Sequence, residues 1–162
     1  MDAGILVIAG QAFPETDGTD GQVLTTDGAG TIAWEDSTTE KIIIIPVFDS
    51  GTSVTTGDGK SYVFIPEELN GMNLINAHAA NNTVSSAGTP TVQIYNVTQA
   101  ADMLSTRITI DASEKTSYTA STQPVIDTAN DDVATGNELR VDVDVAGTGT
   151  AGLQVTLTFD TP

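Results

Sequence analysis

The chain has 162 residues and carries 5 Lys and Arg against 22 Asp and Glu, a formal net charge of −17. A surface this acidic repels phosphate backbones and anionic lipid headgroups, which argues against nucleic-acid binding and membrane attachment. There is no cysteine and only one histidine, His78, which excludes a disulfide framework, a thiolate nucleophile and a multi-histidine metal centre. The longest apolar runs, Ile5–Ala9 and Ile42–Phe48, are far shorter than the ~20 residues of a membrane-spanning helix. No basic residue precedes the first run, so we also expect no secretory signal peptide.

Residues 1–40 contain eight acidic residues and no basic one. Within them, Val23–Thr26 and Thr31–Trp34 flank a glycine-rich turn at Asp27–Gly30, a pattern that predicts a small β-hairpin. Strands of about four residues are not stable alone in water, so this segment must either fold back on its own domain or dock onto another chain. We predict docking, with residues 1–40 as an extended anchoring arm. The predicted contact residues are its apolar ones: Ile5, Leu6, Val7, Ile8, Phe13, Val23, Leu24, Ile32 and Trp34.

After Lys41 the sequence becomes typical of a β domain. Ile42–Ile45 is an uninterrupted β-branched run, which predicts a strand buried on both faces. Tyr62–Ile65 predicts a further strand, and Met72–Ala80 resumes an extended pattern. Between them, Pro66–Gly71 places proline first, acidic residues next and glycine last, which predicts one short helical turn.

The later strands show a period of two. Such alternation is typical of antiparallel sheets that have one face on a core and one in water. The alternating stretches are Val92–Tyr95, Leu104–Ile110, Glu138–Val145 and Leu153–Asp160. Between them, Asp127–Val133 predicts one more helical turn, with Asp127 as its N-cap.

These patterns predict an all-β protein in which residues 41–162 form an antiparallel β-sandwich. About seven or eight strands with long polar connections fit a jelly-roll-like sandwich. An immunoglobulin-like sandwich remains an alternative, since periodicity does not determine strand order. The abundance of threonine, which suits half-exposed strands, agrees with either topology.

Two segments resemble parts of bacteriophage structural proteins. Gly18–Trp34, with its Gly-Gln-Val-Leu, Asp-Gly and final Trp, resembles a short module of phage fibre and other virion proteins. Lys60–Phe159, including Ile126–Gly136 and the Leu139–Val145 strand, resembles the small β-sandwich decoration, cement or head-fibre proteins of phage heads. The resemblance implies a structural virion protein, made in the host cytoplasm and bound to the outer surface of the head. It also implies trimers, and an N-terminal arm that contacts the major capsid protein or another virion protein.

A second reading is a short tail fibre or fibre tip that binds a host receptor. The fibre-like segment favours it, whereas the absence of a long shaft and the small number of aromatic residues argue against it. Counting the copies in each virus particle distinguishes the two, because decoration needs hundreds of copies and a fibre needs few.

The sequence gives little support for an enzyme. A serine–histidine triad would have to use His78, and no Gly-x-Ser-x-Gly elbow supplies the nucleophile. Sugar clefts need aromatic platforms, and the chain has one Trp and three Tyr. We therefore predict no catalytic activity and no cofactor.

A bound metal is also not predicted. Aspartates near turns could supply oxygen ligands for calcium, but none of them lies in an EF-hand pattern. These aspartates are Asp17, Asp20, Asp127, Asp131, Asp132, Asp142 and Asp144.

Overall fold

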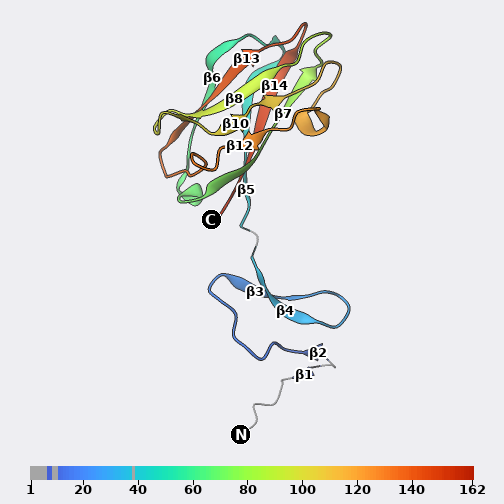
Figure 1. Ribbon diagram of the computed structural model, residues 1–162, viewed down its shortest axis with the longest axis vertical. Helices are drawn as coiled ribbons and strands as arrows, with labels where there is room; N and C mark the ends of the chain where they lie inside the picture. The colour runs from blue at the N-terminus through green and yellow to red at the C-terminus, as the bar shows by residue number, and fades with distance from the viewer. Residues whose placement is uncertain (1–6, 9–10, 38) are drawn as a thin grey trace. The chain divides into compact units, whose positions relative to one another are not determined.

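The computed structural model describes residues 7–8, 11–37 and 39–162 (Figure 1). Contacts divide the chain into two units, Met1–Thr39 and Glu40–Pro162. In the described residues the only helical segments are two 3-10 turns, η1 (Glu67–Leu69) and η2 (Ser117–Thr119). No helix in that part of the chain is long and apolar enough to cross a membrane. The protein is all-β, as predicted.

The N-terminal unit consists of short paired strands. In it, β1 (Val7–Ile8) pairs with β2 (Gln11–Ala12), and β3 (Gln22–Thr26) pairs with β4 (Ile32–Asp36), both antiparallel. A single parallel bridge between Ala12 and Thr31 joins the two pairs. The predicted hairpin is confirmed, and each of its strands is five residues long.

The second unit contains two main sheets, and all of their strand pairs are antiparallel. The first sheet has the order β5 (Lys41–Ser53), β14 (Ala151–Asp160), β7 (Asn73–Thr83). The second has the order β6 (Gly57–Phe64), β13 (Glu138–Val145), β8 (Thr91–Asn96), β11 (Ile108–Thr109). Shorter strands flank the second sheet: β9 (Ala101–Asp102) pairs with β8, and β10 (Leu104–Thr106) pairs with β12 (Val125–Ile126).

The long strands alternate between the two sheets along the chain. β5 lies in the first sheet, β6 in the second, β7 in the first and β8 in the second. The last two strands then insert between earlier ones, β13 between β6 and β8, and β14 between β5 and β7. This winding is that of a jelly roll. An immunoglobulin-like sandwich keeps its first two strands in one sheet, so that alternative is excluded.

The core lies between the two sheets, which form the two layers of the sandwich (Figure 1). Alternate residues of β13 and β14 point into it, and all are at most 2% exposed: Leu139, Val141, Val143, Leu153, Val155, Leu157 and Phe159. The predicted alternation is confirmed for these seven residues, whereas Val145, predicted on the same face of β13, is 43% exposed, and Asp142, predicted on the water face, is 5% exposed. The stretch over 104–110 is instead two short strands, because the chain leaves β12 at Thr106 and joins β8 at Ile108.

The prediction for Ile42–Ile45 was wrong. Ile45 is 3% exposed, whereas Ile42 and Ile44 are 62% and 61% exposed. The reason is that β5 belongs to an outer layer of the sandwich and has only one face on the core. Its alternate side chains therefore point out of the first sheet, and at Ile42 and Ile44 they stay exposed.

The predicted helical turn after Asp127 is a side-chain-capped turn instead. The Asp127 carboxylate accepts hydrogen bonds from the Ala129 backbone N–H and from the Asn130 amide, at 3.1 and 2.8 Å. Aspartate often stabilises a single turn in this way without starting a helix. The turn predicted at Pro66–Gly71 is present as η1.

Candidate interaction surfaces

The apolar residues of the hairpin lie on two opposite faces. Leu24 lies directly opposite Trp34, and Thr26 lies opposite Ile32. Because side chains alternate along a strand, Leu24, Ile32 and Trp34 share one face. Val23 lies opposite Glu35 on the other face. The structure therefore brings together three of the predicted contact residues and separates Val23 from them.

Trp34 is held by its own chain. The indole Nε1 donates a hydrogen bond to the Thr16 carbonyl oxygen at 2.9 Å. Gly18 lies directly against the ring, since a Cβ added there would be 2.7 Å from Trp34 Cδ2. The segment before β3 thus covers part of the indole, and Trp34 is half-buried before any partner binds.

The turn of the hairpin is organised by Asp27. Its Oδ1 accepts hydrogen bonds from the backbone N–H groups of Ala29 and Thr31, at 2.7 and 3.0 Å. The hydrogen bonds from Thr31 and Ala29 hold the pKa of the Asp27 carboxyl below its usual value. Gly30 has a φ of +104°, which a residue with a side chain rarely adopts. The turn therefore needs both the carboxylate and the glycine.

The other predicted contact residues are placed as follows. Val23 and Leu24 are 44% and 39% exposed, and Phe13 is half-buried. Val7 and Ile8 form β1, while Ile5 and Leu6 lie outside the described residues. The hairpin thus presents a small apolar surface of the kind that a protein partner can cover.

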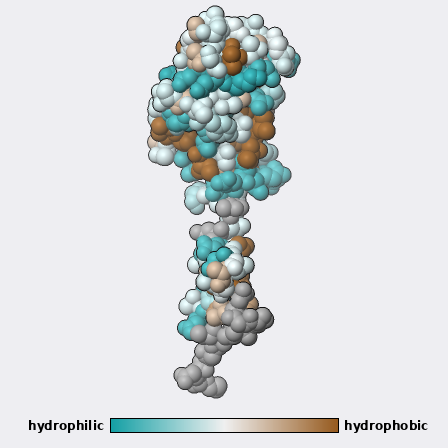
Figure 2. All heavy atoms as spheres, turned by 90° about the vertical axis from the view of Figure 1, so that its right-hand side faces the viewer, coloured by the Kyte–Doolittle hydropathy of each residue, from teal (hydrophilic) through white to brown (hydrophobic). Residues whose placement is uncertain are grey.

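The sandwich also exposes hydrophobic side chains, and sequence reasoning missed these. Besides Ile42 and Ile44 on β5, Tyr62 and Phe64 on β6 are 52% and 64% exposed. Figure 2 shows hydrophobic residues in separate patches on the sandwich, between hydrophilic ones. In the structure Tyr62 and Phe64 alternate with the half-buried Ser61 and Val63, but the apolar Val63 between them hides this alternation in the sequence.

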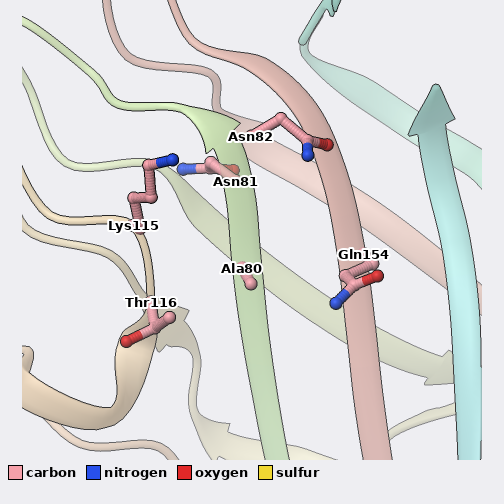
Figure 3. Close-up of a pocket in the computed structure, with 6 residues that line it drawn as sticks. All are labelled: Ala80, Asn81, Asn82, Lys115, Thr116 and Gln154. Atoms are coloured by element: carbon pink, nitrogen blue, oxygen red, sulfur yellow. The ribbon is translucent and has the colours of Figure 1, made fainter. Parts of the chain in front are cut away.

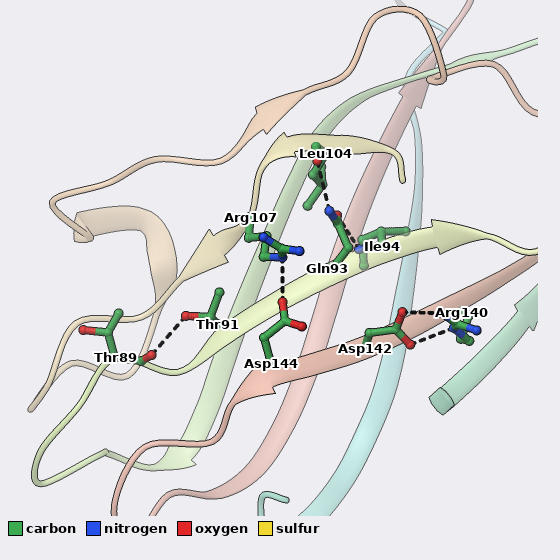
Figure 4. Close-up of polar contacts among 9 residues, drawn as sticks. All are labelled: Thr89, Thr91, Gln93, Ile94, Leu104, Arg107, Arg140, Asp142 and Asp144. Atoms are coloured by element: carbon green, nitrogen blue, oxygen red, sulfur yellow. Dashed lines mark hydrogen bonds and ion pairs between the residues drawn. The ribbon is translucent and has the colours of Figure 1, made fainter. Parts of the chain in front are cut away.

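Ion pairs lie on part of the outer face of the second sheet (Figure 4). Arg107 Nε lies 2.6 Å from Asp144 Oδ2, and Arg140 Nε lies 2.7 Å from Asp142 Oδ1. The Arg140 guanidinium also lies 4.4 Å from the centre of the Tyr95 ring. The hydrogen bond with Asp142 raises the pKa of Arg140 above its usual value. These pairs neutralise carboxylates within the chain.

His78 is part of a packed cluster on β7. Its Nδ1 lies 3.0 Å from Ser117 Oγ, and its ring centre lies 4.0 Å from that of Tyr118. The Ser117 oxygen already accepts a hydrogen bond from the Ala79 backbone N–H, so its own hydrogen can be donated to Nδ1. Burial lowers the pKa of His78, which favours the neutral ring that accepts this bond. Because Ser117 is fully buried, the pair is suited to holding η2 on the sheet rather than to attacking a substrate.

A polar hollow of about 250 Å³ lies beside the end of β7 (Figure 3). Asn81, Asn82, Lys115, Thr116 and Gln154 supply its polar lining. The Asn81 side chain is 95% buried (5% exposed), and neither of its polar atoms has a hydrogen-bond partner within the described residues. The lining suits hydrogen bonding to water or to a small polar molecule.

The described residues contain no group of three or more His, Asp or Glu side chains that could hold a metal ion. Several of the aspartates considered for calcium have other partners. Asp127 accepts hydrogen bonds from its own turn, and Asp142 and Asp144 pair with arginines.

No protein-family model, no curated protein and no solved structure matches this chain. The jelly-roll topology is therefore assigned from the strand order, and the candidate surfaces from the exposure of their side chains.

Proposed function

We propose that the protein is a structural virion protein that decorates the outside of a bacteriophage head. It binds as a trimer, through its N-terminal unit, to the major capsid protein or another virion protein, and it stabilises the shell by bridging neighbouring subunits. The observation that carries the proposal is the division of the chain into a small hairpin unit with exposed apolar residues and a jelly-roll sandwich with its own complete core.

The hairpin is suited to be the docking element. Its turn is already ordered by Asp27, and Trp34 is already fixed against Gly18. Since less conformational entropy is lost when a preformed element binds, such a hairpin binds better than a flexible peptide of the same composition. The face formed by Leu24, Ile32 and Trp34 is the natural contact surface.

A single hairpin gives only weak attachment. Full burial of a valine or leucine side chain contributes roughly 1.5–3 kcal/mol, and Val23 and Leu24 are already more than half buried. A subunit that must stay on a shell therefore needs more than one contact. Three hairpins held in one trimer supply this, because each further contact forms at a high effective concentration.

The test is binding to purified empty heads of the phage that carries the gene. We compare the full chain with Leu24→Asp, which places a charge on the proposed contact face, and with Val125→Asp, which places one on an exposed residue of the sandwich. Co-sedimentation with heads should be lost for Leu24→Asp and retained for Val125→Asp. Unchanged binding of Leu24→Asp, together with unchanged binding after deletion of residues 1–39, would remove the hairpin from the proposal.

A short tail fibre or fibre tip is the second candidate. It is favoured by the hairpin of β3 and β4, most of which lies in Gly18–Trp34, the segment that resembles a fibre module. Quantitative gel analysis of purified virions separates the two. Hundreds of copies in each particle support decoration, and a few copies support a fibre.

A further inference from the structure

One lateral margin of the sandwich is open, and the opposite one is covered. β5 and β6 are the terminal strands of their sheets, and in the described residues each pairs with one other strand. They lie together on one margin, where the Ser61 hydroxyl donates a hydrogen bond to the Pro46 carbonyl oxygen at 3.1 Å. The free side of β7 is instead bridged by Thr116 and Asp132. Proteins usually protect edge strands, so the open margin requires an explanation.

Exposed hydrophobic side chains flank the open margin on both sides. Ile42 and Ile44 point out of the first sheet and are 62% and 61% exposed. Tyr62 and Phe64 point out of the second sheet and are 52% and 64% exposed. Single exposed apolar residues are ordinary, but a pair on each of two adjacent edge strands, one pair on each outer face, indicates two contact patches. We call these the isoleucine flank (Ile42, Ile44) and the aromatic flank (Tyr62, Phe64).

The charge of this margin favours another copy of the chain as the partner. β5 and β6 contain two lysines and two aspartates, so their formal charges cancel, whereas the whole chain carries −17. Elsewhere the approach of an identical, strongly acidic molecule is opposed by like-charge repulsion. The neutral, apolar margin is where a second copy can come into contact.

We propose that the margin formed by β5 and β6 is the contact between copies, and that the isoleucine flank of one copy packs on the aromatic flank of the next. The two flanks differ in residues and face out of opposite sheets, so one flank meeting the other gives a head-to-tail contact, which closes into a ring when the rotation between successive copies adds up to a full turn. A two-fold contact would have to bring both flanks of each copy, which face out of opposite sheets, into one interface. That the ring contains three copies rests on the proposed function. Arg140, which lies opposite Tyr62 and pairs with Asp58, forms a polar border to the aromatic flank.

The first test is the mass of the full chain in solution at micromolar concentration, measured by sedimentation velocity. We expect a trimer for the native sequence, monomers for Ile44→Asp and for Phe64→Asp, and a trimer for the control Val125→Asp. Val125 is 52% exposed on β12, outside the open margin, so this control adds the same charge to a comparably exposed side chain. A monomeric native chain, or trimers for both flank variants, overturns the proposal.

The second test distinguishes a ring from a two-fold contact. In a mixture, Ile44→Asp retains the aromatic flank and Phe64→Asp retains the isoleucine flank, so one complete contact can form. We expect a dimer that contains one copy of each variant, although each variant alone is monomeric. If the mixture does not associate, or if only one variant loses the trimer, the head-to-tail arrangement is wrong.

A folding control accompanies both tests. Ile44→Thr and Phe64→Thr replace the same side chains with a β-branched polar residue that suits a strand, and they should also lose the trimer while keeping the native far-UV circular dichroism. The outcome is separable from that of head binding. Leu24→Asp leaves the margin intact and should remain trimeric. The sedimentation experiments can therefore disprove the contact between copies while the hairpin still binds heads, and loss of head binding leaves the contact between copies untouched.

Discussion

The two units of the chain are stabilised by different interactions. The sandwich contains a continuous core in which side chains such as Leu157 and Phe159 are fully buried. Residues 12–35 of the hairpin unit include no fully buried side chain, and this stretch depends on the Asp27 turn and on the contact of Trp34 with Gly18. The difference separates a part that is stabilised by its own core from a part that is stabilised by a few local contacts. It also predicts that the two units respond separately to mutation, and Trp34, the only tryptophan, reports on the hairpin alone.

The largest expected effect comes from the core. Leu157→Ala should lower the free energy of unfolding of the sandwich by about 2–5 kcal/mol, because it leaves a cavity between the sheets. Urea unfolding followed by far-UV circular dichroism should show the loss, while the Trp34 fluorescence transition stays in place. Thr158→Ala, on the outer face of the same strand, should change the stability by no more than about 0.5 kcal/mol. If the Trp34 transition moves together with the circular dichroism, the two units unfold as one.

A smaller effect should come from the contact beneath the indole. Gly18→Ala places a methyl group 2.7 Å from Trp34 Cδ2, so the ring must move, at a cost of about 1–3 kcal/mol to the hairpin. The emission of Trp34 should shift to longer wavelength while unfolding of the sandwich is unchanged. Gly21→Ala is the control, since a methyl group there meets nothing within 4 Å, although its φ of +86° adds backbone strain. An equal shift in both variants would mean that backbone strain, and not the contact with the indole, causes the change in the Trp34 emission.

Local patterns in the sequence were sufficient to predict much of this architecture. The Asp-Gly turn between two short apolar stretches predicts the hairpin because the residues that define it are adjacent. The alternation of β13 and β14 predicts the seven residues of these strands that line the core, but not that Val145 is exposed and Asp142 buried. Strand order depends on pairing between segments far apart in the sequence, such as β5 with β14, and so the choice between jelly roll and immunoglobulin topology needed the structure.

The candidate surfaces were harder to predict, for two physical reasons. Ile42–Ile45 has no periodicity, so nothing in it shows that alternate isoleucines are exposed on an edge strand. The contact between Gly18 and Trp34 joins residues that are not neighbours in sequence, so a pattern of single residues does not reveal it. The pairing of Leu24 with Trp34, by contrast, follows from the length of the turn once the hairpin is assumed.

The smallest expected effect is the response of the hairpin to acid. Hydrogen bonds from Thr31 and Ala29 hold the pKa of Asp27 below its usual value of 3.8, so the folded hairpin favours the ionised carboxylate. Its stabilising contribution is therefore complete above about pH 4 and is lost as the pH falls through the lowered pKa. A pH titration of Trp34 fluorescence should show a transition below pH 3.8.

Two variants make this titration specific to the turn. Asp27→Ala removes the acceptor, so the hairpin should already be loosened at neutral pH and should lack the acid transition. Asp20→Ala removes another exposed carboxylate from the same unit and should keep it. If Asp27→Ala titrates like the native chain, the carboxylate does not hold the turn. The preformed hairpin would then lose its main support, and the N-terminal unit would have to be ordered by its partner rather than before it binds.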